Sequence, residues 1–395
     1  MGLGRIGLAT AVTFVRAGRA VVGVERDEAL LDDIRDGALS YAEPEQLGPA
    51  LDAVELRSSI DELDGSTIDA WIVCVGTNDG GRLDASGVVA VARKIIGRAR
   101  SAAVVAIEST VPPGTCDELA ELRADVHIVH CPERGAPGNL IAELATQPRL
   151  IGGTTPQAAQ AARELYEDVG TGPLVVCTAR ESELAKLAEN AHRAVNVAFA
   201  GELARTARAL QVDPRRLVEL ANTHPRVEIL RPGLGAGGDC LPMATRWFAD
   251  RDERGVAAGA RRIDAGVADE ILALMRREAP AARRVALLGT AYKPDVAYAH
   301  AVERDRSTPA HALYAALATE YDVTTWDGLR EQDDHDALQA ALTTADVVVF
   351  GCAHRLFGEL DPVTLRDFAR GAVAIDFVGA IDASWWQAAG WSVLR

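Results

Sequence analysis

The sequence predicts an α/β protein in which two doubly wound parallel-sheet domains are joined by a central helical segment. Short apolar runs alternate with helical stretches over residues 1–179, and the same alternation returns over residues 280–395. Between these regions, residues 180–279 place apolar positions at helical spacing. Strands of a parallel sheet appear as continuous apolar runs because helices cover both faces of the sheet. We therefore expect three parts, with boundaries near residues 179 and 279.

A glycine-rich turn precedes the first expected strand. Gly2, Gly4 and Gly7 form the pattern G-x-G-x-x-G ahead of a helix-compatible run, and Glu25 ends the strand that follows. In a Rossmann-like domain these glycines make a tight turn, admit a pyrophosphate and pack helix on strand. An acid at the strand end binds the adenine ribose and repels a 2′-phosphate, so we predict NAD as the cofactor. The expected strands of this domain lie in RAVVGVE, DAWIVCVGT, AAVVAIEST, VHIVHCPE, RLIGGT and PLVVC.

This fingerprint needs a buried strand in front of it, yet only Met1 precedes Gly2. Without that strand, its neighbours in the sheet would leave backbone groups unpaired in a buried layer. We therefore expect a few apolar residues upstream of Met1 in the true reading frame.

The middle and last parts follow from their own patterns. The run ESELAKLAENAHRAVNVAFAGELARTARAL has no glycine or proline before Gly201 and predicts long helices, and a second helix is expected over residues 257–278. Pro280 marks a plausible boundary. The expected strands of the last domain lie in RRVALLGTAYKP, DVTTWD, ADVVVFGCAH and AVAIDFVG.

Charge and cysteine usage exclude several classes of protein. Acidic residues outnumber basic residues by 57 to 41, which gives a net charge of −16 without a long basic run. Such a surface repels nucleic acid and anionic lipid. The six cysteines form no C-x-x-C pair and no cluster with metal-ligand spacing. Because no targeting leader or long apolar span is present, we expect a cytoplasmic protein without a metal, a membrane or a nucleic-acid partner.

Polar residues stand where several apolar patterns stop. Thr110 and Glu133 follow two neighbouring expected strands, and Lys186 and Asn190 lie four residues apart on one helix face. Cys240 follows RPGLGAGGD, which is too rich in glycine for a helix or a strand and suits close approach of backbone to a ligand. Ligands bind at the carboxyl ends of strands in such sheets, so these residues are candidates for a site.

These stretches resemble the UDP-glucose/GDP-mannose dehydrogenase family over nearly the whole chain. The blocks that carry the resemblance, in family order, are CPERGAPG, KLAENAHRAVNVAFAGEL, ANTHPRVEILRPGLGAGGDC, GTAYKPD, RDRSTP and CAHRLF. The resemblance implies an NAD-dependent double oxidation of the C6 alcohol of a UDP-hexose or UDP-N-acetylhexosamine. It also implies a cysteine thiohemiacetal and thioester on the way to the uronic acid, and a homodimer formed through the central helices.

The resemblance assigns a role to each candidate catalytic residue. Cys240 would be the nucleophile, because an aldehyde held as a thiohemiacetal can deliver a second hydride. Lys186 and Asn190 would donate hydrogen bonds to the developing oxyanion. Glu133 would activate or position the hydrolytic water, and Thr110 would hold a water near the reacting hydroxyl. Taken alone, such charged residues are more often solvated surface groups, and isolated cysteines are usually small core residues.

The resemblance also implies two sets of binding residues. Those for NAD are Gly2, Gly4, Gly7, Glu25, Thr77, Thr110 and Arg306. Those for the UDP-sugar are His224, Arg226, Gly235, Gly237, Arg261, Tyr292 and Lys293, with Arg261 reaching across the dimer interface. An arginine suits a diphosphate because its planar fork donates two parallel hydrogen bonds.

The chain departs from the family pattern at positions near the expected pocket. Ala244 stands where the family carries an aspartate, and alanine can neither accept a proton nor orient a water. Asp239 directly precedes the cysteine, and a neighbouring carboxylate disfavours a thiolate. Val378 stands where the family has an arginine, and an insertion precedes Arg306.

These departures leave three interpretations open. The first is a nucleotide-sugar 6-dehydrogenase. The second is an oxidoreductase of the same fold with an altered substrate or a single oxidation. The third is a catalytically impaired partner subunit that still binds a nucleotide-sugar. The sequence does not identify the nucleotide or the sugar.

Overall fold

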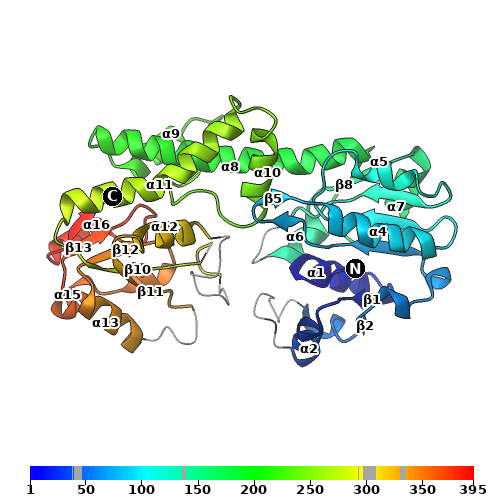
Figure 1. The fold of residues 1–395 in the computed structure, drawn as a ribbon, viewed down its shortest axis with the longest axis horizontal. Coiled ribbons are helices and arrows are strands. Elements are labelled where there is room, and N and C mark those ends of the chain that lie inside the picture. The colour runs from blue at the N-terminus through cyan, green and yellow to red at the C-terminus, as the bar shows by residue number, and fades with distance from the viewer. Residues whose placement is uncertain (38, 40–46, 136–138, 292, 297–307, 330–334) are drawn as a thin grey trace. The chain divides into compact units, whose positions relative to one another are not determined.

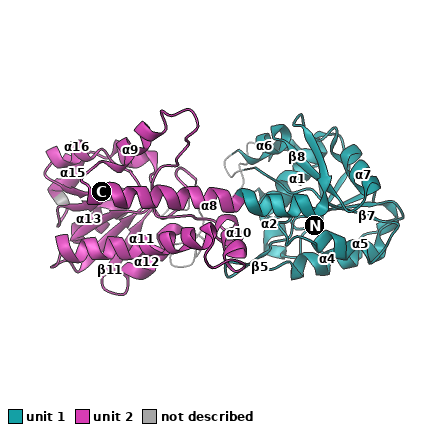
Figure 2. Ribbon diagram, turned by 90° about the horizontal axis from the view of Figure 1, so that it is seen from above, with its two compact units in different colours: residues 1–189 teal, residues 190–395 magenta. Residues whose placement is uncertain are grey.

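A computed structural model describes the chain except residues 38, 40–46, 136–138, 292, 297–307 and 330–334 (Figure 1). The described chain divides into two compact units, residues 1–189 and 190–395 (Figure 2). Helix α8 (Ala179–Ala209) contributes residues to both units. The division into three parts, at residues 179 and 279, stays a prediction.

Unit 1 contains a five-stranded sheet with the order β3-β6-β7-β8-β9 and a separate parallel pair, β1 with β2. Each of the six expected runs contains a strand. Strand β2 was not expected, because the alternating charges of VELR mask its pattern. The strands are β1 (Val21–Val24), β2 (Val54–Arg57), β3 (Ala70–Val73), β6 (Val104–Ile107), β7 (His127–His130), β8 (Arg149–Gly153), β9 (Leu174–Thr178) and the short hairpin β4 (Asn78–Asp79) with β5 (Arg82–Leu83).

The five-stranded sheet of unit 1 is parallel, as expected, except at one strand pair. Strand β8 pairs antiparallel with β7 and parallel with β9. A parallel crossover must carry the chain back along the full length of the preceding strand. Helix α6 (Leu140–Thr146) has only 7 residues and ends close to the start of β8, so it does not provide that return.

Met1 and Gly2 lie between β1 and β3 and bond to both strands. The Met1 ammonium donates to the Ile72 carbonyl at 2.8 Å, and the Cys74 N–H donates to the Met1 carbonyl at 2.8 Å. On the other side, the Gly2 N–H donates to the Val24 carbonyl at 2.9 Å. Burial lowers the pKa of the Met1 ammonium. These two residues occupy the place of a central strand, and the expectation of further residues upstream stays a prediction.

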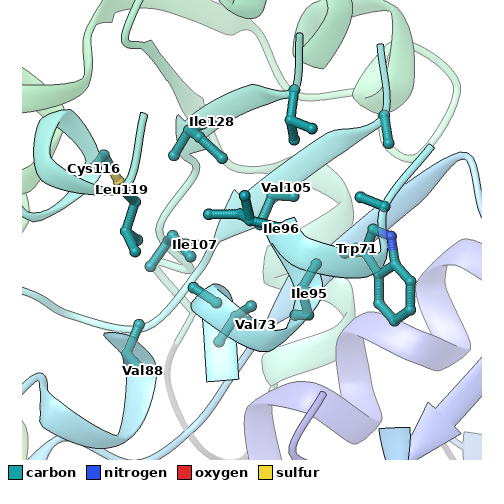
Figure 3. Packing of buried hydrophobic residues seen from close by; sticks show 14 of the residues in the cluster. Trp71, Val73, Val88, Ile95, Ile96, Val105, Ile107, Cys116, Leu119 and Ile128 are labelled. Carbon is teal, nitrogen blue, oxygen red and sulfur yellow. The ribbon is translucent and has the colours of Figure 1, made fainter. Parts of the chain in front are cut away.

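Helices cover both faces of the five-stranded sheet. Alternate residues of β6 enter two different cores: Val105 and Ile107 pack with α4 (Ser86–Arg98) and α5 (Thr115–Ala120), as Figure 3 shows. Val104 and Ala106 instead pack with α7 and the end of α1. This two-sided burial explains why β6 is apolar at every position. The other helices of this unit are α1 (Arg5–Arg16), α2 (Glu28–Asp36) and α7 (Pro156–Tyr166).

Unit 2 contains a fully parallel sheet with the order β11-β10-β12-β13-β14. Its alternating strand residues also enter two cores, one with α11 and α12 and one with α13 to α16. The four expected strands are present, and β14, which has 3 residues, was not expected. The elements are α9 (Pro214–Ala221), α10 (Cys240–Ala249), α11 (Val256–Glu278), β10 (Arg284–Leu288), α12 (Pro309–Leu317), β11 (Asp322–Trp326), α13 (His335–Thr344), β12 (Val347–Phe350), α14 (Arg355–Glu359), α15 (Pro362–Phe368), β13 (Val373–Ile375), α16 (Ala383–Ala388) and β14 (Ser392–Leu394).

Four helices begin with the same local signal, an oxygen-bearing side chain followed by proline. Thr155, Asp213, Thr308 and Asp361 each accept a backbone N–H of the first helical turn. Proline at the next position lacks an N–H that would otherwise have no partner, and its fixed φ suits the first turn. These caps fix the starts of α7, α9, α12 and α15 from sequence alone.

Candidate active site

The glycine turn leads directly into α1 and leaves room for a ligand. A Cβ at Gly7 would overlap the Gly2 carbonyl oxygen, so the helix can approach the turn only with glycine there. A Cβ at Gly4 would meet nothing within 4 Å. Gly4 is also the N-cap of α1 and supplies no side-chain cap. The first N–H groups of α1 are therefore placed to bind an anion such as a pyrophosphate.

Glu25 lies at the end of β1, where the sequence predicts the ribose-binding acid. Its Oε2 accepts the Leu3 N–H at 2.8 Å, and its Oε1 accepts the Asp27 N–H at 3.1 Å. The carboxylate thus fastens the glycine turn to the end of the strand. Thr77 is buried beyond the end of β3, at the same edge of the sheet.

Lys186 and Glu133 are brought together, as the sequence predicts. The Lys186 ammonium lies 3.3 Å from Glu133 Oε1 and also donates to the Glu133 backbone carbonyl. Lys186 is 6% exposed and Asn190 is 7% exposed, so neither is a solvated surface group. Within the described chain, Glu133 Oε2 and Asn190 Nδ2 are buried atoms with no hydrogen-bond partner. Such orphaned buried atoms are uncommon and call for a ligand or a water.

Sequence reasoning missed the polar residues of α8 that lie beside Lys186. Ser182 Oγ lies 2.8 Å from His130 Nδ1, and both residues are fully buried. Glu183 accepts the Gly114 N–H at 2.6 Å and the Cys116 N–H at 2.8 Å, so its carboxylate caps the start of α5. Burial raises the pKa of Glu183 despite these two bonds. The signal was present in the run SELAK, where Ser182 and Glu183 lie four and three residues before Lys186.

A second buried network that the sequence did not reveal lies beneath α1. Glu108 has a fully buried carboxylate that pairs with Arg149 at 2.8 Å. The same carboxylate accepts hydrogen bonds from the Thr10 hydroxyl at 2.8 Å and the Tyr166 hydroxyl at 3.0 Å, and Cys74 Sγ lies 3.4 Å away. Burial, reinforced by the Glu108 charge, raises the pKa of Cys74 and Tyr166 well above their usual range. We assign this cluster to the stability of unit 1.

Cys240 is exposed and is the first residue of α10, directly after the glycine-rich loop of residues 233–238. Asp264 of α11 holds the loop, because its Oδ2 accepts the Ala236 N–H at 3.1 Å. A Cβ at Gly235, whose φ is +113°, would lie 3.2 Å from the Asp264 Cγ. Asp264 was not singled out by sequence reasoning.

Asp264 makes the stability of the chain depend on pH. Burial raises the pKa of its carboxyl to about 6, although the Ala236 N–H opposes the shift. Because this pKa exceeds the ordinary value, the folded chain binds more protons than the unfolded chain between about pH 4 and 6. The free energy of unfolding therefore falls as the pH rises through this range.

Asp264→Asn keeps an oxygen that can accept the Ala236 N–H and removes the titration. We expect it to raise the free energy of unfolding by on the order of 1–3 kcal/mol at pH 7.5, with little effect at pH 4.5. Urea unfolding of both proteins at the two pH values measures this difference. An equal effect at both pH values would contradict it.

In the last α/β region, the described candidate is Lys293, which is exposed at the carboxyl edge of β10. Tyr292 and Arg306 lie outside the described residues. Beside Lys293 is a buried group that sequence reasoning missed. Asp327 accepts the N–H groups of Thr290 at 2.5 Å and Ala291 at 2.9 Å, and its Oδ2 lies 3.4 Å from His354 Nε2.

The remaining substrate candidates lie on exposed or half-buried parts of unit 2. His224 and Arg226 are exposed after α9, and the Arg226 N–H donates to His224 Nδ1 at 3.3 Å. Arg261 and Gly237 are half-buried, on α11 and in the loop before Cys240. The structure places Cys240 in unit 2 and Lys186, Glu133 and Thr110 in unit 1. Their meeting around one substrate stays a prediction.

The departures from the family pattern lie in packed surroundings. Ala244 is fully buried one turn after Cys240 on α10, so an aspartate there would have to find a buried partner. Val378 packs against both cores of the sheet in unit 2. Next to it, the Arg208 guanidinium stacks on the Phe377 ring at 3.6 Å.

Two further features of the described residues concern metal binding and membrane insertion. Over the described residues, no three or more histidine, cysteine, aspartate or glutamate side chains gather in an arrangement that could hold a metal ion. Within the same residues, no helix has the length and hydropathy needed to cross a membrane.

The glycine turn at α1 and the acid at the end of β1 define a dinucleotide-binding α/β protein. Residues 1–170 match the NAD-binding domain of the UDP-glucose/GDP-mannose dehydrogenase family, and residues 180–264 match that family's central domain. The chain belongs to this family and uses NAD. The resemblance, the fold class and the cofactor predicted from the sequence are therefore confirmed.

Similar proteins extend over nearly the whole chain. The UDP-N-acetyl-D-mannosamine dehydrogenase of Pyrococcus horikoshii is 32% identical, with 95% of this chain and 94% of the relative covered. The protein of the same name from Escherichia coli K12 is 32% identical, with 90% and 93% covered. A solved structure of the Pyrococcus horikoshii UDP-D-ManNAc dehydrogenase aligns with a TM-score of 0.87 at 31% identity, with 96% and 95% covered.

Proposed function

We propose that this chain is a nucleotide-sugar 6-dehydrogenase that oxidises the C6 alcohol of a UDP-hexose or UDP-N-acetylhexosamine to the carboxylate. The observation that carries the proposal is the buried polar set on α8. Lys186 and Asn190 are almost fully buried, and Asn190 Nδ2 and Glu133 Oε2 have no partner among the described residues. The relatives named as UDP-N-acetyl-D-mannosamine dehydrogenases favour a UDP-N-acetylhexosamine.

In the proposed mechanism, the glycine turn and the first N–H groups of α1 would hold the pyrophosphate of NAD, and Glu25 would bind its adenine ribose. Bound NAD supplies the hydride acceptor for each oxidation. Thr110 lies at the carboxyl end of β6, where it can hold a water that takes the proton of the C6 hydroxyl. Arg306 completes the cofactor contacts that we propose.

Cys240 links the two oxidations. Its thiolate adds to the carbon of the intermediate aldehyde, so that a C–S bond forms and the carbonyl oxygen becomes an oxyanion. The Lys186 ammonium and the Asn190 amide donate hydrogen bonds to that oxygen, each worth roughly 3 kcal/mol in comparable sites. Loss of a hydride from this thiohemiacetal leaves a thioester. Water then adds to the thioester with Glu133 as the base, the C–S bond breaks, and the thiol is released with the carboxylate product.

The remaining candidates hold the UDP-sugar in this proposal. Lys293 contributes a cation from the edge of the sheet in unit 2, and backbone of the loop at residues 233–238 lies against the sugar. His224, Arg226, Arg261 and Tyr292 complete the set that we propose. The Ala244 position favours one alternative, an oxidoreductase of this fold that performs a single oxidation or takes a modified sugar.

We also propose that the chain acts as a cytoplasmic homodimer formed through its central helices. Several large apolar side chains of this region are exposed: Phe199 by 46%, Leu210 by 70% and Leu220 by 51%. A second copy of the chain would cover such residues. Arg261 would then reach the substrate held by the partner.

The decisive experiment counts NADH. Purified protein is mixed with excess NAD and a limiting amount of each of several UDP-sugars, including UDP-N-acetylmannosamine and UDP-glucose, and absorbance at the NADH maximum is followed to completion. We expect two NADH per sugar for the true substrate. One NADH per sugar would identify the single oxidation, and binding without NADH would identify a partner subunit. Light scattering on the same preparation tests the dimer, which a monomer would contradict.

A further inference from the structure

The loop that carries Lys293 is gripped at its beginning by one carboxylate. Asp327, at the end of β11, accepts the backbone N–H groups of Thr290 and Ala291 and the Thr290 hydroxyl on the same oxygen, at 2.5, 2.9 and 3.1 Å. Hydrogen bonds from these groups and from His354 lower the pKa of Asp327 to about 2 despite its burial. The carboxylate of Asp327 is therefore ionised at neutral pH.

The far end of the same loop is gripped by His354. This histidine is 1% exposed, and its Nδ1 accepts the Asp295 N–H at 2.9 Å. Asp295 has a φ of 58°, a left-handed conformation that is unfavourable for a residue with a side chain. Its carboxylate accepts the backbone N–H and the Nε–H of Arg355, each at 2.9 Å. Asp295 is thus held in this conformation from both sides.

These bonds determine the tautomer of His354. Since Nδ1 accepts a hydrogen bond, the single proton of the neutral imidazole lies on Nε2. Nε2 faces Asp327 Oδ2 at 3.4 Å, so it donates toward the carboxylate that holds the beginning of the loop. One imidazole therefore connects the two ends of the loop.

The loop occupies the position in this sheet where a ligand is expected. The strand order β11-β10-β12 means that the chain leaves β10 toward one neighbour and returns on its other side. Ligands bind at the carboxyl ends of strands beside such a reversal. The ends of β10 and β12 lie very close there, because a Cβ at Gly289 would be 2.8 Å from the Cys352 carbonyl oxygen. Lys293 lies in this loop between Ala291, which is bonded to Asp327, and Asp295, which is bonded to His354.

We propose that His354 is a positioning residue for nucleotide-sugar recognition, which acts through the Asp295 N–H to hold residues 293–296 and thereby the place of Lys293. The proposal rests on the proposed function for the identity of the ligand. His354 itself is buried and does not touch the substrate. Its loss should therefore weaken binding of the UDP-sugar more than it slows turnover of the bound complex.

Two variants test the roles of the two ring nitrogens of His354 individually. In His354→Asn, the amide oxygen can take the place of Nδ1 and accept the Asp295 N–H. In His354→Gln, the amide nitrogen can take the place of Nε2 and donate to Asp327, while the acceptor for Asp295 is lost. We expect KM for the UDP-sugar to rise at least tenfold in His354→Gln and less than threefold in His354→Asn, with kcat within threefold of the unchanged protein in both. Equal KM values in the two variants would overturn the proposal.

Hydrogen exchange of the peptide that contains residues 289–296, followed by mass spectrometry without substrate, gives a readout that needs no activity. We expect faster exchange in His354→Gln than in His354→Asn, and slow exchange of the Asp295 amide in the unchanged protein. Fast exchange of that amide in the unchanged protein would contradict the hydrogen bond from Asp295 to His354, even if neither variant folds. If no UDP-sugar is bound or oxidised, the proposed function fails, while the exchange contrast still decides whether His354 holds the loop.

Discussion

Replacement of Cys240 by alanine is expected to reduce NADH formation by at least about 10³-fold, on the scale seen when an enzyme's nucleophile is removed. Without the thiol, the aldehyde has no covalent route to the thioester, so the second oxidation is lost. A single slow oxidation of the alcohol can persist, because that step needs no nucleophile. The measurement is the rate of NADH formation together with the final ratio of NADH to sugar.

Binding and a second cysteine provide the controls. Cys240 is exposed at the start of α10, so its truncation leaves no cavity, and NAD should stabilise the variant against heat as it does the unchanged protein. Cys177, which is half-buried in β9, is the matched position, and Cys177→Ala should retain activity within about threefold. Full turnover by Cys240→Ala would remove the thiohemiacetal from the mechanism.

Replacement of Glu108 by alanine is expected to lower the free energy of unfolding of unit 1 by about 3–5 kcal/mol. The change removes the partner of Arg149, whose side chain is 9% exposed, and leaves a guanidinium charge buried without compensation. It also removes the acceptor of the Thr10 and Tyr166 hydroxyls. Urea unfolding followed by a probe within unit 1 measures the loss, which is a large part of the stability of a typical domain.

An exposed pair provides the comparison for this prediction. Arg19 and Asp168 lie 3.7 Å apart with side chains 45% and 77% exposed, so Asp168→Ala should change the stability by less than about 1 kcal/mol. In the double variant Glu108→Leu with Arg149→Met, the uncompensated charge is absent, so the loss should be smaller than in Glu108→Ala. If Glu108→Ala were as stable as Asp168→Ala, the cluster would not have the structural role that we assign to it.

The fold was largely predictable because its signals are local and periodic. Strands β6 and β12 are apolar at each position because both of their faces are buried. The reversal at β8 was not predictable, because strand direction depends on where the chain returns after α6. Strands β2 and β14 were not expected, because β2 contains charged residues and β14 is a short strand with no buried position.

The candidate site was predictable only in its exposed or motif-bearing parts. The glycine turn was identified from its G-x-G-x-x-G pattern, and family blocks mark Lys186 and Glu133. Glu183 and His354 were not found, because their importance depends on backbone N–H groups that lie 67 and 59 residues away in the sequence. Side chains that accept hydrogen bonds from distant backbone N–H groups produce no periodic pattern in the sequence. Such residues become visible only when the hydrogen bonds of the folded protein are traced.

The carboxylate of Glu183 has a consequence for protein engineering. Because it caps the start of α5 from α8, the turn after Thr110 and the first part of the long helix form one transplantable module. A chimera that exchanges residues 110–116 with those of a relative should also bring that relative's residue at position 183. In a library of variants that changes the turn alone, most members would lose the cap that Glu183 provides. Such a library would underestimate how many sequences the site tolerates.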